Sequence, residues 1–152
     1  MTKTTVLAAL AIVLVVAVPA SLAQPLQEQG RSSARGQIIV RSREILKGDD
    51  VTNGGVAARG RFRISGAIID KGKVTDYRTV KGGTALIRRV AVGARGAITF
   101  LITIHLGESG PEPWKIASAT RAFKGLHGKG RQVVDKYYET PAHFVLKGTV
   151  SR

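Results

Sequence analysis

From residue 37 onwards the chain is a succession of short segments in which apolar and polar residues alternate, separated by turns rich in glycine. The segment 97–106 shows the pattern most clearly, because every second residue from Ile98 to Leu106 is apolar. Alternation with a period of two places such residues on one face of a β-strand. β-Branched residues dominate this segment and glycines lie at both ends, which argues against a helix. The pattern therefore predicts an all-β fold.

Segments of this kind follow one another at a spacing of roughly 8 to 15 residues, which is typical of a sandwich or a barrel. Eight strands in up-and-down order can close completely, and their interior then holds side chains or one small ligand. We expect an eight-stranded antiparallel up-and-down barrel, with strands at 37–46, 56–68, 73–80, 84–92, 97–106, 114–118, 130–138 and 142–151. Residues 47–55 are expected to form a turn, in which Asn53-Gly54 is a strong hairpin signal.

The first residues have the three parts of a secretory signal peptide. Lys3 precedes an unbroken apolar run at 6–18, which Pro19 ends and small residues up to Ala23 follow. The run has 13 residues, fewer than the ~20 that a helix needs to span a bilayer. We expect a secreted, extracellular protein (periplasmic in a Gram-negative host) without a transmembrane segment in its mature form. The expected organisation is a signal peptide at 1–23, a disordered polar leader at 24–36 and a barrel domain at 37–152.

Several kinds of chemistry are not expected from this composition. The chain has no cysteine, which rules out disulfides, thiol catalysis and cysteine-based metal sites. It also lacks a G-x-S-x-G nucleophile motif, a phosphate-binding loop and a dinucleotide fingerprint. The three histidines are scattered along the sequence rather than spaced as metal ligands. We expect no catalytic set, no metal and no cofactor.

Basic residues give the chain a formal net charge of +14, which favours polyanionic partners. No nucleic-acid recognition motif accompanies this charge, so specific nucleic-acid binding is not expected. Within 56–68, three arginines alternate with residues that include Phe62 and Ile64, so the arginines should share the water-facing side. Two interpretations stay open, a solvated face that discourages edge pairing and a docking strip for an acidic polymer. The candidate polyanion-binding residues are Arg59, Arg61 and Arg63.

One pair of charged residues is expected inside the barrel. Asp76 alternates in phase with Val74 and Val80, and Arg88 shares a face with Leu86 and Val90. If these apolar faces point inward, both charges enter the interior, where unpaired charges are seldom found. We therefore predict an internal Asp76–Arg88 ion pair at the mouth of a pocket, the alternative being an exterior arginine and a wholly apolar interior. Interior residues both fill the core and line any cavity of a small barrel, and the candidate lining residues are Phe62, Asp76, Arg88, Phe100, Trp114 and Phe144.

The stretch 114–130 resembles a known family. A W-x-I strand followed by a segment like G-T-G-x-Y/F-x-G-L-x-G-x-G is matched here by Trp114, Ile116, Thr120, Phe123, Gly125, Leu126, Gly128 and Gly130. The chain thus resembles the small bacterial secreted proteins with an allene oxide cyclase-like barrel, relatives of plant allene oxide cyclase and dirigent proteins, over residues 60–150. Ala119 and Arg121 stand where that family usually has glycines, so Arg121 would be strained if its backbone needs a positive φ. The plant cyclase's catalytic residues do not map onto this chain.

The preferred functional interpretation is a monomeric or weakly dimeric secreted barrel that binds a small apolar or amphipathic ligand without catalysis. The resemblance implies a first alternative, an isomerase- or cyclase-like enzyme that guides a reactive intermediate. Such catalysis needs mainly a shaped cavity and a few polar groups. A second alternative is a basic surface protein that holds acidic extracellular polymers through its arginines.

Overall fold

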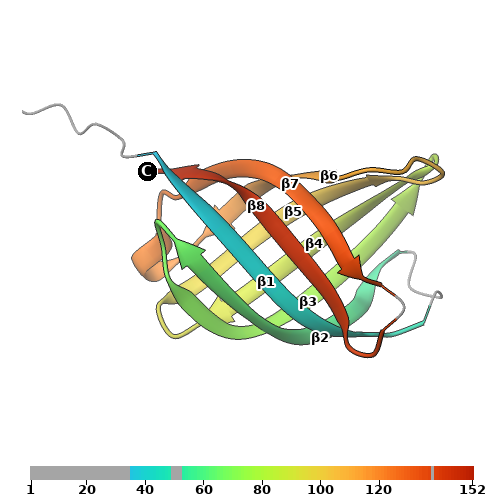
Figure 1. The fold of residues 1–152 in the computed structure, drawn as a ribbon, viewed down its shortest axis with the longest axis horizontal. Coiled ribbons are helices and arrows are strands. Elements are labelled where there is room, and N and C mark those ends of the chain that lie inside the picture. The colour runs from blue at the N-terminus through green and yellow to red at the C-terminus, as the bar shows by residue number, and fades with distance from the viewer. Residues whose placement is uncertain (1–34, 49–52, 138) are drawn as a thin grey trace, which may run out of the picture. The chain divides into compact units, whose positions relative to one another are not determined.

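The computed structural model describes residues 35–48, 53–137 and 139–152. In these residues, eight antiparallel strands form a closed barrel in which each strand pairs with the next one in sequence and β8 pairs with β1 (Figure 1). The strands are β1 (Gly36–Leu46), β2 (Asn53–Gly66), β3 (Asp70–Lys81), β4 (Thr84–Gly93), β5 (Gly96–His105), β6 (Glu112–Ala119), β7 (His127–Lys136) and β8 (Ala142–Ser151). The predicted all-β, eight-stranded up-and-down barrel is confirmed. The signal peptide predicted at 1–23 lies outside the described residues, as does the leader predicted at 24–36 up to residue 34.

The start of β2 differs from the prediction. The strand begins at Asn53, so Asn53-Gly54 lies inside a strand rather than in a hairpin turn. Gly54 has a φ of 81°, and the pairing of β2 with β3 shifts register between Asn53 and Gly55. A glycine with positive φ serves a β-bulge as readily as a turn, and the sequence alone does not distinguish the two.

The barrel interior follows the alternation of the strands. In β5, Ile98, Phe100 and Ile102 are buried at 1% exposure or less and belong to one hydrophobic core. Phe100 meets Trp114 of β6 edge to face, with ring centroids 5.5 Å apart. Such edge-to-face contacts between aromatic rings are favourable beyond the area that they bury.

Two glycines make room for the Trp114 indole. Trp114 is opposite Gly130 in the β6–β7 pairing, and Gly130 is opposite Gly148 in the β7–β8 pairing. A Cβ atom would lie 2.7 Å from the indole Cζ2 at Gly130 and 2.5 Å from it at Gly148, closer than real Cβ contacts. The backbone of β7 and β8 can therefore approach the ring only because these positions lack a side chain.

A short 3-10 helix, η1 (Arg121–Phe123), packs at the end of the barrel where β5 begins. The Ala122 amide donates to the Arg95 carbonyl, at 3.1 Å. Phe123 and Leu126 are buried there as part of the hydrophobic core. Side chains thus fill this end of the barrel, which also holds the C-terminus (Figure 1).

Candidate functional site

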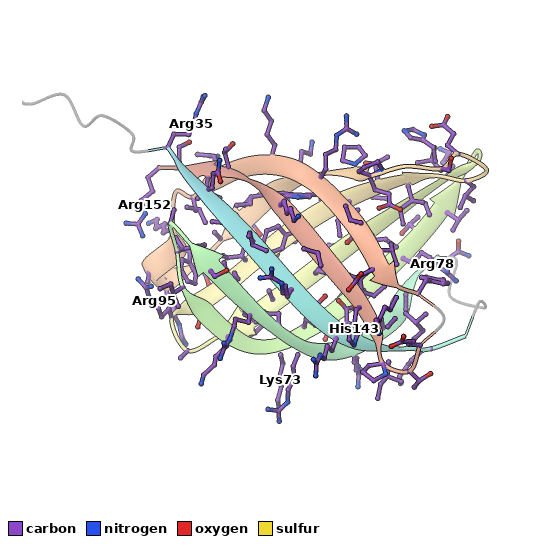
Figure 2. All side chains as sticks on the ribbon, in the orientation of Figure 1. Arg35, Lys73, Arg78, Arg95, His143 and Arg152 are labelled. Atoms are coloured by element: carbon purple, nitrogen blue, oxygen red, sulfur yellow. The ribbon has the colours of Figure 1, made fainter. Side chains whose placement is uncertain are left out.

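The opposite end of the barrel contains a cavity of about 630 Å³. Its walls come from the end of β1, the start of β2, the end of β3 and the start of β4, together with the adjoining parts of β5 to β8. Arg78, one of the lining residues, lies at this end (Figure 2). The volume falls within the roughly 300 to 1,000 Å³ that small-molecule sites occupy. The apolar part of the wall includes Ala58, Ala85, Ile87, Ile104 and Phe144.

Arg89 of β4 organises the polar part of the cavity. Its Nε and Nη2 atoms donate to the two carboxylate oxygens of Asp76, at 2.9 and 2.7 Å. Its Nη1 atom donates to Gln132 Oε1 at 3.1 Å, and its Nη2 atom lies 2.9 Å from Glu44 Oε1. The guanidinium group also lies 4.8 Å from the centre of the Phe144 ring. A bidentate pair of this kind fixes geometry as well as charge.

The cluster is almost completely withdrawn from water. Arg89 is 1% exposed, Glu44 0% and Asp76 5%. Burial by itself lowers the pKa of Arg89, but the charges of Asp76 and Glu44 outweigh it, so the pKa is raised. A buried arginine between two carboxylates is the arrangement that keeps a charge stable away from water.

Glu44 is the member of the cluster with unused bonding capacity. Its Oε1 atom accepts from the Ser42 hydroxyl and faces Arg89, whereas no donor in the described part of the chain reaches its buried Oε2 atom. Burial is the largest influence on this carboxyl group and, together with the charge of Asp76 and a hydrogen bond between the two carboxyl groups, it raises the pKa to about 7 against the opposing effects of Arg89 and Ser42. Glu44 can therefore accept or donate a proton near neutral pH.

The predicted partner of Asp76 is wrong by one residue. Asp76 is opposite Arg89 in the β3–β4 register, and the inward side chains of β4 are Ala85, Ile87, Arg89 and Ala91. Arg88 is exposed on the outside, with its guanidinium 4.1 Å from the centre of the Tyr77 ring. Both faces of β4 carry aliphatic residues, so the period-two pattern did not decide which one points inward.

The other predicted lining residues divide into two groups. Asp76 and Phe144 line the cavity. Phe62, Phe100 and Trp114 are buried in the hydrophobic core and are not among the residues that line this cavity. The predicted surface arginines Arg59, Arg61 and Arg63 are exposed on the outside of β2.

Sequence reasoning missed Glu44 and Gln132. Both are buried and take part in the Arg89 cluster. Glu44 is separated from the buried residues Ile38 and Val40 by an even number of positions, so the alternation of β1 could have predicted that it points inward. Gln132 stands beside two consecutive valines, which obscure the alternation in that strand.

Across the described ranges, no group of three or more His, Cys, Asp or Glu side chains is placed to hold a metal ion. A search of the same residues for helices with the length and hydropathy to cross a membrane found none.

The fold and this site define a closed β-barrel with one filled end and one open end, where an ionic cluster meets a cavity. Comparisons with protein-family models, curated proteins and solved structures found no match. The resemblance to the allene oxide cyclase-like barrels therefore stays a prediction.

Proposed function

We propose that this protein binds a small amphipathic molecule in the cavity at the open end of the barrel. The observation that carries the proposal is the Oε2 atom of Glu44, which no donor of the described chain reaches and which is buried beside a cavity with aliphatic and aromatic walls. A buried polar atom without a partner is costly, and a ligand that supplies a hydrogen bond removes that cost. The apolar part of the ligand would lie against Ala58, Ile87 and Phe144.

The charge of the cavity narrows the class of ligand. Its lining includes four carboxylates, Glu44, Asp76, Glu112 and Glu139, and two guanidinium groups, Arg78 and Arg89. Lys136 pairs with Glu139 at 2.8 Å and the pKa of Glu44 is raised to about 7, so the positive and negative charges around the cavity nearly balance. A site that presents carboxyl oxygens beside apolar walls favours a ligand whose polar group donates hydrogen bonds.

A cavity-filling variant tests the proposal. Ala85 is 3% exposed and lines the cavity, so Ala85→Phe would place a ring in the space available to a ligand. The probe is N-phenyl-1-naphthylamine, an apolar amine whose fluorescence rises on leaving water. We expect the wild type to bind it and Ala85→Phe to bind at least about tenfold more weakly, as expected when the site is occluded.

The matched control is Ala117→Phe, because Ala117 is exposed on β6. This variant should bind the probe as the wild type does. Circular dichroism and the unfolding midpoint of each variant show whether the barrel is intact. Equal binding by a folded Ala85→Phe variant would contradict the proposal.

A second candidate function is proton transfer to a ligand, as in a cyclase- or isomerase-like enzyme. The observation that favours it is the pKa of Glu44, raised to about 7 chiefly by burial. A group that titrates near the working pH is suited to general acid–base catalysis. Incubating the recovered ligand with the protein separates the two functions, because an enzyme returns a new isomer on chromatography and a binder returns the same compound.

A further inference from the structure

The outside of the barrel carries a dense array of positive charge over β1, β2 and β3. Seven exposed side chains form it, and they are called the basic face here: Arg41, Arg43, Arg59, Arg61, Arg63, Lys71 and Lys73. Figure 2 shows Lys73 projecting away from the barrel. The sequence predicted only Arg59, Arg61 and Arg63 for this surface. The other four residues lie on β1 and β3, and the pairing of these strands with β2 brings them beside the three arginines.

Strand register arranges six of these cations in two rows across the sheet. In the first row, Arg61 is opposite Arg43 on one side and Lys73 on the other. In the second row, Arg63 is opposite Arg41 and Lys71. Neighbouring strands lie about 4.8 Å apart, so the Cα atoms that carry the three cations of a row span roughly 10 Å.

The basic face contains no compensating negative charge from its own strands. The carboxylates of β1, β2 and β3 belong to Glu44, Asp70 and Asp76, and all three are buried. Like charges directly opposite each other destabilise a sheet. The cations of the basic face therefore repel one another within the fold, whereas a polyanionic partner would neutralise their charge.

We propose that the basic face binds an acidic polysaccharide, whose carboxylate or sulfate groups pair with the two rows. Five of the seven cations are arginines, which hold such oxyanions with two parallel hydrogen bonds. The outward residues of β1 and β2 include no aromatic ring for stacking nucleic-acid bases, and the one outward ring of β3, Tyr77, is covered by the Arg88 guanidinium at 4.1 Å from its centre. The rows run around a convex wall, which a flexible chain can follow and a planar lipid surface cannot. This site is separate from the cavity and does not depend on the proposed function.

Charge removal in two places tests the proposal. One triple variant replaces Arg43, Arg61 and Arg63 with Gln, and the control replaces Lys81, Lys115 and Lys124, which are exposed elsewhere. Both variants lose three positive charges. Binding of purified protein to polygalacturonate and dextran sulfate is measured against salt concentration, with neutral dextran as the blank.

We expect the basic-face variant to lose about tenfold or more in affinity and its logarithmic salt slope to fall by roughly 2 to 3. The control variant should keep affinity within about threefold, since its charges lie away from the rows. The unliganded basic-face variant should also melt at a higher temperature than wild type in low salt, because like-charge pairs are removed.

Three results would overturn the proposal. Equal losses in the two variants would show attraction by net charge alone. Unchanged binding by the basic-face variant would place the polymer elsewhere. Tighter binding to single-stranded DNA or to vesicles with anionic lipid than to both polysaccharides would assign the face to another partner.

Discussion

At the scale of single residues, Glu44 combines complete burial with a carboxyl group that Arg89 only partly neutralises. Arg89 is shared with Asp76, whose two oxygens already accept from the guanidinium. Glu44 faces the same guanidinium through one oxygen, and no donor in the described chain reaches the other. The cluster is therefore well suited to hold one carboxylate as an ion and a second carboxyl group in a variable protonation state.

The raised pKa of Glu44 predicts a specific dependence of stability on pH. The folded pKa of about 7 lies above the ordinary value of 4.5, so the folded state holds a proton that the unfolded state releases. The resulting stabilisation is present below pH 4.5 and is lost as the pH rises to about 7. Between pH 5 and 8 this loss should be roughly 2 to 3 kcal/mol in the free energy of unfolding.

Denaturant unfolding of wild type and Glu44→Gln at pH 5 and pH 8 checks this dependence. The variant should lack the Glu44 contribution and therefore lose less stability than wild type between the two values. Asp135→Asn is the control, because Asp135 is exposed on β7. A pH dependence in Glu44→Gln as steep as in wild type would contradict the assignment.

The ion pair of Asp76 predicts unequal effects for two neighbouring arginines. Asp76→Asn and Arg89→Gln each break a buried pair and should lower the free energy of unfolding by roughly 3 to 5 kcal/mol. Arg88→Gln removes an exposed side chain stacked on Tyr77 and should cost no more than about 1 kcal/mol. Thermal unfolding of the three variants measures the difference. A larger loss of stability for Arg88→Gln than for Arg89→Gln would contradict the β3–β4 register, in which Asp76 is opposite Arg89.

At the scale of elements, η1 contains a backbone conformation that its sequence does not favour. Arg121 has a φ of 51°, whereas the other positive φ values among the described residues belong to glycines. The family that the chain resembles usually has glycine there, and the sequence predicted strain at Arg121 only on the condition that its backbone needs a positive φ; the structure meets that condition. A side chain in this region costs roughly 1 to 2 kcal/mol.

Relieving this strain should stabilise the protein. Arg121→Gly is expected to raise the free energy of unfolding by roughly 1 kcal/mol, since glycine adopts positive φ without a steric penalty. Lys124→Gly is the matched control, because Lys124 has a φ of −52° and gains nothing from glycine. Denaturant unfolding should show the control slightly less stable than wild type. A loss of stability in Arg121→Gly would mean that the arginine side chain contributes more than the strain removes.

The strands were predictable from the sequence, whereas the faces that point into the barrel were left open by it. All eight strands follow from alternation and glycine turns, and β5 has the clearest pattern because a single face carries its large apolar residues. In β4 the pattern is ambiguous, because Leu86 and Val92 are 40% and 52% exposed although they are aliphatic. The pairing with β3 decides the face there, and pairing is a property of the barrel that one strand's sequence does not contain.

At the scale of the whole barrel, the two ends differ in how side chains fill them. Phe123 and Leu126 fill the end beside η1. The other end contains a cavity of about 630 Å³, which the Arg89 cluster lines. Neither the filling nor the cavity could be predicted from periodicity, because both depend on how the closed barrel positions side chains from distant strands. The sequence did predict a charged pair inside, since Asp76 falls on an apolar face.

Native mass spectrometry shows whether the open-end cavity holds a small amphipathic molecule. The protein is purified from its native host at physiological salt, as wild type and as Ala85→Phe. We predict a discrete additional mass on the wild type that is absent from a folded Ala85→Phe variant. A bare mass for the wild type, or the same additional mass on both proteins, would contradict a ligand in this cavity.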